Sequence, residues 1–208
     1  IAGFNTGSLP LAVNCAGFIP LAMMAAADGS FGYEMEIITR VDSGIEKIED
    51  LRDRKLAFTS PTSNSGFKAP SALLKTEFNL EADRDFEPAY SGKHDNSLLG
   101  VYNHDYDAAA VANVVTDRLF VQGIVDREQI RVLYRSETFP TTGFGIAHDL
   151  HPDLAKKIQE AFFSFPWKGS RLDVEFPNDD GFIPISYQNH WSVIRQIDEG
   201  LGLTYSCR

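Results

Sequence analysis

A polar loop between a short apolar strand and a helix is the feature that most constrains the fold of this chain. Residues 55–59 read KLAFT, and an apolar helical face runs on to about Phe78. Of the nine residues 59–67, five are Ser or Thr, one is Asn, and Gly66 lets the backbone approach a ligand. Hydroxyls and free N–H groups at a helix start form a neutral anion site. One hydroxyl is also enough to cap a helix, so the loop alone leaves both interpretations open.

Segments with strand and helix patterns alternate along the chain. Strands are expected at 35–39, 55–59, 106–111 and 130–134, and helices from about residue 66 to 78, at 95–102, around 118–121, at 152–165 and at 191–197. Residues 182–185 are expected to form a loop or an edge strand because Pro184 has no N–H to donate. The apolar residues 9–27, which include Pro10 and Pro20, indicate a buried loop and a helix. This alternation predicts an α/β fold with mostly parallel sheets.

Charge and composition exclude several classes of partner. The chain has 19 Lys plus Arg against 29 Asp plus Glu, a formal net charge of −10, and no basic run, which argues against nucleic acid. No stretch of about 18 apolar residues is present, so no transmembrane helix is expected. No nucleophile elbow or dinucleotide fingerprint occurs, so no catalytic residue or cofactor is predicted. His148, Asp149 and His151 have a spacing that could suggest a metal, but Leu150 and Pro152 beside them indicate the entry to a helix, and no metal site is predicted. Cys15 and Cys207 could form a bridge or remain as two buried thiols.

Two further loops have binding chemistry. Residues 91–97 (SGKHDNS) precede a helix, and His94 offers ring N–H donors, although a lone histidine is more often structural. Residues 3–8 (GFNTGS) place two glycines around Asn5 and Thr6, which suits either a tight turn or a ligand clasp. The residues themselves do not decide between these alternatives.

Four segments together resemble one family. Residues 57–70 (AFTSPTSNSGFKAP) and 91–94 (SGKH) are similar to the two ligand loops of the phosphate/phosphite/phosphonate-binding proteins of ABC importers. Residues 106–109 (YDAA) and 135–140 (RSETFP) fit later strand and hinge segments of that family. The resemblance runs through essentially the whole chain, and the combined motifs are more specific than any one of them.

The resemblance implies a type II periplasmic-binding-protein fold of two lobes that close on a ligand by hinge motion. Residues 1–40 and 136–208 would belong to the first lobe and 41–135 to the second, with hinge crossings near Ile38 and Ser136. A βαβ stretch and a signal peptide would precede Ile1, whose surroundings resemble the middle of a strand. The expected protein is a monomer, periplasmic or lipid-anchored outside the inner membrane, and its partner is a membrane permease.

The resemblance also assigns a ligand set for a small phosphorus oxyanion held in the cleft between the lobes. The expected ligand-binding residues are Phe4, Asn5, Thr6, Thr62, Ser63, Asn64, Ser65 and His94. Relatives often have Thr where Asn64 stands and Tyr where Phe4 stands, so an amide and a phenyl ring replace hydroxyls. The residues after Pro140, Thr-Thr-Gly, include no acid to hold an amino group. Phosphite, phosphate or a small alkyl phosphonate is therefore expected rather than an aminophosphonate.

A second interpretation is an enzyme or a ligand-sensing domain on the same fold, such as a pyrimidine-precursor synthase. It would need a base or nucleophile in the cleft, and His94 is the one plausible candidate. Fold sharing alone says little about function, so the transport interpretation is preferred.

Overall fold

A computed structural model describes residues 1–205 and 207, and these residues form two compact units. Unit 1 comprises Ile1–Gly32, Phe139–Gln196 and Thr204–Arg208, and unit 2 comprises Tyr33–Thr138 and Ile197–Leu203. This division differs from the expected boundary after residue 40. Strand β3 (Met35–Arg40) lies in unit 2 because both of its hydrogen-bonded neighbours belong to the sheet of that unit. Ile38, where a hinge crossing was expected, is fully buried inside this strand.

The remaining elements follow in chain order. The strands are β1 (Ala2–Phe4), β2 (Phe18–Ala25), β4 (Lys55–Phe58), β5 (Glu87–Tyr90), β6 (Ala108–Ala112), β7 (Ile130–Arg135), β8 (Gly143–Ala147) and β9 (Gly181–Pro184). The α-helices are α1 (Leu9–Ala16), α2 (Ala69–Phe78), α3 (His94–Tyr102), α4 (Asn113–Val121), α5 (Pro152–Phe163), α6 (Arg171–Glu175), α7 (Tyr187–His190) and α8 (Ser192–Gly200). The short helical turns are η1 (Ile48–Leu51), η2 (Asn64–Lys68) and η3 (Arg127–Gln129), of which η2 is a π-turn continuous with α2.

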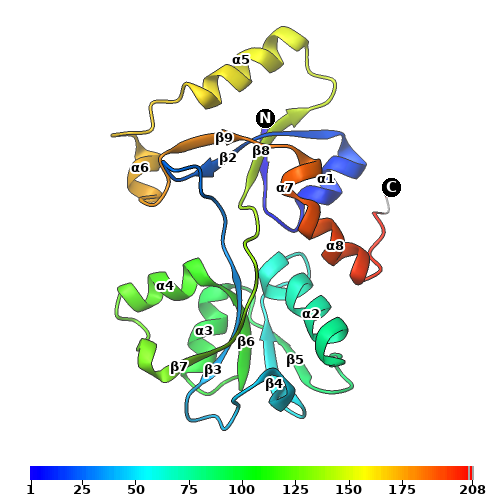
Figure 1. The fold of residues 1–208 in the computed structure, drawn as a ribbon, viewed down its shortest axis with the longest axis vertical. Helices are drawn as coiled ribbons and strands as arrows, with labels where there is room; N and C mark the ends of the chain where they lie inside the picture. The colour runs from blue at the N-terminus through cyan, green and yellow to red at the C-terminus, as the bar shows by residue number, and fades with distance from the viewer. Residues whose placement is uncertain (206, 208) are drawn as a thin grey trace. The chain divides into compact units, whose positions relative to one another are not determined.

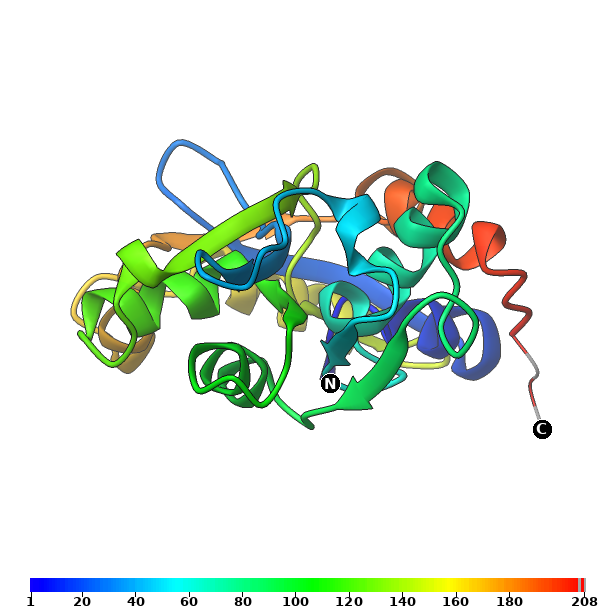
Figure 2. The same cartoon turned by 90° about the horizontal axis from the view of Figure 1, so that it is seen from below.

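The sheet of unit 2 has the strand order β5-β4-β6-β3-β7. Strand β4 pairs in parallel with β5 and β6, whereas β3 pairs antiparallel with β6 and β7. Helices α3 and α4 lie on one face of this sheet and α2 on the other (Figures 1 and 2). Both faces of β6 are therefore covered, which explains why its sequence, AAAVA, is apolar at every position and fully buried.

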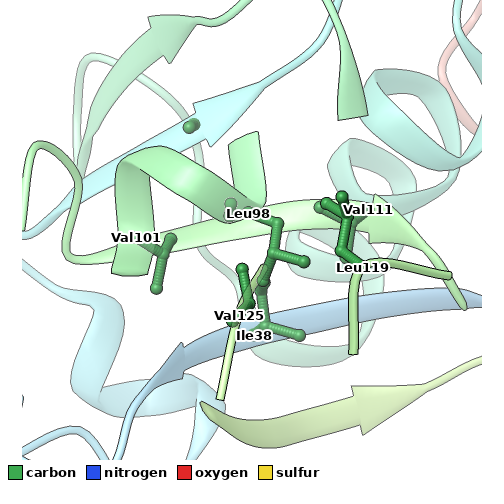
Figure 3. Packing of buried hydrophobic residues seen from close by; sticks show 8 residues of the cluster. Ile38, Leu98, Val101, Val111, Leu119 and Val125 are labelled. Carbon is green, nitrogen blue, oxygen red and sulfur yellow. The ribbon is translucent and has the colours of Figure 1, made fainter. Parts of the chain in front are cut away.

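Buried side chains cover both faces of the sheet of unit 2. Figure 3 shows Ile38, Val111, Leu98 and Leu119 meeting between the sheet and helices α3 and α4. Side chains one residue along point the other way, since successive residues of a strand face opposite sides. Each fully buried aliphatic side chain of this kind stabilises the fold by about 1.5–3 kcal/mol. These contacts hold the carboxyl ends of the strands, and the loops that follow them, in fixed positions.

The sheet of unit 1 has the order β1-β8-β2-β9, and its pairs are antiparallel. The α/β class and the binding-protein fold are as expected, but both sheets differ from the expectation of mostly parallel pairing. Strand β2 was missed, because Pro20 indicated a loop. In the structure Pro20 lies at a register shift against β8, where a proline is tolerated in a strand.

Aromatic packing and one disulfide hold unit 1 together. Phe162 of α5 packs on Phe182 of β9, with ring centroids 5.0 Å apart, and Trp167 contacts the same ring at 5.3 Å. Cys15 of α1 is bonded to Cys207, so the structure decides between the bridge and the free thiols in favour of the bridge. Among the described residues, no helix is long and apolar enough to cross a membrane.

Candidate functional site

Three strand ends of unit 2 meet at one edge of its sheet and carry the candidate loops. Phe58, the last residue of β4, is paired with Tyr90, the last residue of β5, and β6 lies on the other side of β4. The backbone N–H of Gly92 donates to the carbonyl of Thr59 at 3.0 Å, which ties the loop after β5 to the loop after β4. The carboxyl ends of parallel strands are where α/β folds bind ligands. The loop of residues 59–67 and that of residues 91–94 are therefore side by side.

Ser63 starts the helical run that follows β4. Its hydroxyl oxygen accepts a hydrogen bond from the N–H of Gly66 at 3.1 Å, and its carbonyl accepts from the N–H of Lys68. The run continues from Asn64 through η2 and α2 to Phe78, so it carries the dipole of a full-length helix. The first N–H groups of a helix have no carbonyl of the helix to bond. The amides of Asn64 and Ser65 are in this position.

Gly66 is required by the close approach of β4's end to this turn. Thr59 donates its N–H to the carbonyl of Gly66 at 2.9 Å. A Cβ atom on Gly66 would lie 1.9 Å from Oγ1 of Thr59 and 2.8 Å from Oγ of Ser63. The absence of a side chain therefore lets two hydroxyls share one small space beside the helix start.

Two buried polar atoms of this loop have no hydrogen-bond partner within the described chain. They are Oγ1 of Thr59 and Oδ1 of Asn64, whose residues are 4% and 3% exposed. The amide nitrogen of Asn64 donates to the hydroxyl of Tyr33 at 3.4 Å, which fixes the orientation of the carboxamide. A buried polar atom left without a partner costs about 1–3 kcal/mol, so such atoms call for an explanation. A polar ligand at this loop would supply one.

His94 stands at the start of α3 and is held by β6. Its Nδ1 accepts a hydrogen bond from the N–H of Ala112 at 3.2 Å, and therefore Nδ1 carries no proton. Burial lowers the pKa of His94 below its ordinary value, although the nearby Asp95 carboxylate opposes the shift. The neutral ring then carries its proton on Nε2, so this residue offers one donor rather than the two expected from a protonated ring.

The other predicted residues of unit 2 differ in their surroundings. Ser65 is 2% exposed, whereas Thr62 is exposed on the turn that precedes Ser63. The assignment of Thr62 and Ser65 as ligand residues stays a prediction.

The three predicted residues of unit 1 have local roles in their own unit. Phe4, at the end of β1, packs edge-on against Phe18 with ring centroids 4.8 Å apart. Asn5 accepts the N–H of Ser8 through Oδ1 at 2.9 Å, one residue before α1 begins. The hydroxyl of Thr6 donates to the carbonyl of Pro140 at 2.6 Å, and its carbonyl accepts the indole N–H of Trp191. Since Thr6 is buried and doubly bonded, its structural role is well defined.

Sequence reasoning did not assign a role to two residues that the structure places at the loop. Thr59 was recognised as part of the polar loop but not as a candidate ligand residue, although its position directly after a buried strand was a usable signal. Tyr33, which contacts Asn64, is 31 residues away along the chain. No pattern in the sequence could indicate that contact.

Comparison with known proteins identifies the family. Residues 1–191 match the family model described as ABC transporter, phosphonate, periplasmic substrate-binding protein. The phosphate-import protein PhnD of Mycolicibacterium smegmatis is 26% identical over 159 residues, covering 72% of this chain and 50% of the relative. The phosphonates-binding periplasmic protein of Escherichia coli is 27% identical over 169 residues, covering 79% and 50%. The chain thus spans about half the length of these curated relatives.

Solved structures support the same fold. The binding protein of an ABC phosphonate transporter from Pseudomonas aeruginosa superposes with a TM-score of 0.79 at 22% identity, covering 94% of this chain and 66% of that one. PhnD1 of Prochlorococcus marinus, solved in complex with methylphosphonate, gives a TM-score of 0.80 at 16% identity, with coverages of 97% and 78%. With the family model matching most of its length, the chain belongs to the family of periplasmic substrate-binding proteins of phosphonate ABC transporters.

Proposed function

We propose that this chain is part of a periplasmic solute-binding protein that captures a small phosphorus oxyanion and delivers it to an ABC permease. The observation that carries the proposal is the loop between β4 and η2. In this loop Ser63 caps the start of a helix, and the buried Thr59 and Asn64 each have a polar side-chain atom without a hydrogen-bond partner. Gly66 has no side chain to fill the space beside these groups. These groups are neutral donors and acceptors that suit a bound oxyanion.

The proposed ligand set in unit 2 is Ser63, Asn64, Ser65, Thr59 and the Nε2–H of His94, with Thr62 at its margin. Phe4, Asn5 and Thr6 of unit 1 remain predicted ligand residues on the strength of the family resemblance. The hydroxyl of Thr6 already donates its hydrogen bond to the carbonyl of Pro140. The backbone N–H of Thr6 or the side chain of Asn5 is therefore the better donor to a ligand. We also propose that units 1 and 2 correspond to the two lobes of the family's fold.

The free energies of the expected hydrogen bonds are consistent with a micromolar dissociation constant. Hydrogen bonds to an ionised oxygen contribute about 1.5–3 kcal/mol each. A micromolar dissociation constant corresponds to about −8 kcal/mol, which a handful of such bonds supplies after the cost of immobilising the ligand. The net charge of −10 repels anions at long range, so the attraction has to come from these local dipoles.

Catalysis has less support. In the part of the chain that the structure describes, His94 is half-buried and its Nδ1 is occupied by the backbone of β6. Among the described residues, no side chain that could act as a nucleophile is hydrogen-bonded to its ring. A periplasmic location and a membrane permease as partner are proposed from the family, and a lipid anchor and a monomeric state are proposals as well.

The test is calorimetric titration of the full-length protein with phosphite, methylphosphonate, 2-aminoethylphosphonate, phosphate and sulfate. We expect saturable one-to-one binding of at least one phosphorus oxyanion and no response to sulfate. Release of inorganic phosphate from a bound phosphonate would instead favour an enzyme. No binding by any phosphorus compound would refute the proposal.

A further inference from the structure

Asn64 differs from the other groups of the proposed site because its unpartnered atom can only accept a hydrogen bond. The hydroxyls of Ser63 and Thr59 can donate or accept, and backbone amides and the Nε2–H of His94 only donate. The carboxamide nitrogen of Asn64 is already used, since it donates to the hydroxyl of Tyr33 at 3.4 Å. Its Oδ1 is therefore the free end of the side chain, and it is buried.

An acceptor beside an anion is unfavourable unless the ligand itself supplies a proton. Two oxygens that both carry negative charge density repel at hydrogen-bond distance, whereas a P–OH group converts that repulsion into an O–H···O bond. A fully ionised oxyanion would leave Oδ1 of Asn64 buried and unsatisfied. Sulfate and sulfonates have no such proton near neutral pH.

We propose that Asn64 selects the protonated form of the phosphorus oxyanion, with its Oδ1 accepting a hydrogen bond from a ligand P–OH group. This inference rests on the proposed function, because it concerns the same site. The remaining oxygens of the ligand accept from the helix-start amides, the hydroxyls and His94. When the free ligand is fully ionised, it takes up this proton from the buffer. In the complex the proton stays on the ligand's P–OH oxygen and is shared in a hydrogen bond with Oδ1 of Asn64.

Other ionisable groups have to be considered before a pH dependence is assigned to the ligand. Strand β3, strand β6 and helix α2 pack against η2, and no side chain of β6 is ionisable. Three groups of ionisable residues lie around this site. Those on β3, α2 and η2 are Glu36, Arg40, Lys68, Lys75 and Glu77; those bonded to η2 are Tyr33 and Asp198; and those in and after the loop that follows β5 are Lys93, His94 and Asp95. Of these, His94 is the one that ordinarily titrates near neutrality, and burial lowers its pKa. It therefore stays neutral between about pH 7 and 9 and does not contribute in that range.

The first experiment measures proton uptake by the full-length protein. Methylphosphonate is titrated by calorimetry between about pH 7 and 9 in two buffers with different ionisation enthalpies, so that the number of protons taken up is obtained directly. Above the second pKa of the free ligand, we expect uptake of about one proton per ligand bound and an association constant that falls about tenfold per pH unit. Binding without uptake, with an association constant that rises to a plateau, would overturn the inference and assign a donor role to Asn64.

A matched ligand and a variant separate the proton from the charge. Methanesulfonate has the charge and nearly the shape of the methylphosphonate monoanion but no hydroxyl, and we expect it to bind at least about 100-fold more weakly. Asn64→Leu keeps the approximate volume and removes the acceptor. It should lower the affinity for the protonated ligand at least tenfold and abolish most of the proton uptake, while the affinity for the dianion changes little. Equal binding of methanesulfonate by the unmodified protein would overturn the inference without any variant.

The two proposals fail in different ways. If no phosphorus oxyanion binds at any pH, the proposed function is wrong and the role of Asn64 is wrong with it. If methylphosphonate binds but no proton is taken up, the proposed function stands and only the selection of the protonated form is wrong.

Discussion

Lys68 and Asp198 form a buried ion pair in unit 2, with Nζ of the lysine 3.0 Å from Oδ1 of the aspartate. The two residues are 130 positions apart in sequence and are 9% and 1% exposed. Lys68 is the last residue of η2, directly after the proposed ligand loop, and Asp198 lies in the second half of α8. The pair therefore attaches the end of the chain's last helix to the helix that carries the candidate site.

Replacing one member of this pair should strongly destabilise unit 2. Lys68→Met leaves the carboxylate of Asp198 buried without the ammonium, and breaking a buried pair in this way costs about 3–5 kcal/mol. Urea unfolding of the two single variants and of Lys68→Met with Asp198→Leu measures the coupling. We expect the double variant to recover most of the loss, because two apolar side chains leave no buried charge. Additive losses would contradict the direct pairing.

Ser63→Ala should weaken binding of the phosphorus oxyanion at least tenfold. The substitution removes a hydroxyl from the site and the cap of the helical run. Ser170→Ala is the matched control, since Ser170 caps α6 in unit 1 in the same way. Each variant should lose about 0.5–2 kcal/mol of stability. Calorimetry should show the affinity loss for Ser63→Ala alone, and an equal loss in the control would mean that capping, not ligand contact, is measured.

Gly66→Ala should impair both folding and binding. The added methyl would meet the side chain of Thr59 at 1.9 Å, and overpacking of this kind costs about 1–3 kcal/mol. Thr59→Ala in the same chain removes the two clashing atoms of Thr59 but leaves Oγ of Ser63 at 2.8 Å, so it should restore part of the stability, although not the ligand contacts. Gly181→Ala serves as the control, because nothing lies within 4 Å of a Cβ there. Thermal unfolding that leaves Gly66→Ala unchanged would be inconsistent with the close approach.

His94 should make the protein less stable in mild acid. Its pKa is lowered in the folded state because burial disfavours the charged ring. The unfolded chain then binds more protons than the folded one, so the free energy of unfolding falls as the pH drops below about 6.5. From about one pH unit above that value, the ring is almost entirely neutral in both states and contributes little slope.

His94→Gln tests this dependence. Urea unfolding at several pH values between about 5 and 8 should give a smaller loss in acid for the variant than for the unmodified protein. The difference between the two curves isolates His94 from the carboxylates that titrate in the same range. If the free energy of unfolding changed with pH in the same way for both proteins, burial would not lower the pKa of His94.

Removing the bond between Cys15 and Cys207 should destabilise unit 1 by about 2–5 kcal/mol. The bridge closes a loop with a sequence separation of 192, and long loops gain most from closure in the chain-entropy description. Thermal unfolding with and without a reductant should show this shift, and the Cys15→Ser, Cys207→Ser variant should not respond to the reductant. A shift in that variant as well would exclude the disulfide as the cause.

Local sequence carried enough information for many of the elements of unit 2. The apolar patterns of 35–39 and 130–134 predicted strands β3 and β7, and the Ser/Thr-rich loop before Gly66 predicted the start of a helix. The family resemblance drawn from residues 57–70 and 91–94 is confirmed by the match to the family model. Strand β2 was missed because Pro20 is a local signal against strands, and only its pairing with β8 and β9 overrides that signal.

What the sequence determined by itself is the chemistry of the loop: which hydroxyls, amides and imidazole it contains, and that they follow strand ends. What the tertiary structure decided is the state of each group. The hydroxyl of Tyr33 accepts from Nδ2 of Asn64, which leaves Oδ1 without a partner, and the N–H of Ala112 donates to Nδ1 of His94. The physical reason is that hydrogen-bond partners and burial are set by residues distant in sequence, which have no local pattern. The partner of Lys68, 130 residues away, is decided in the same manner.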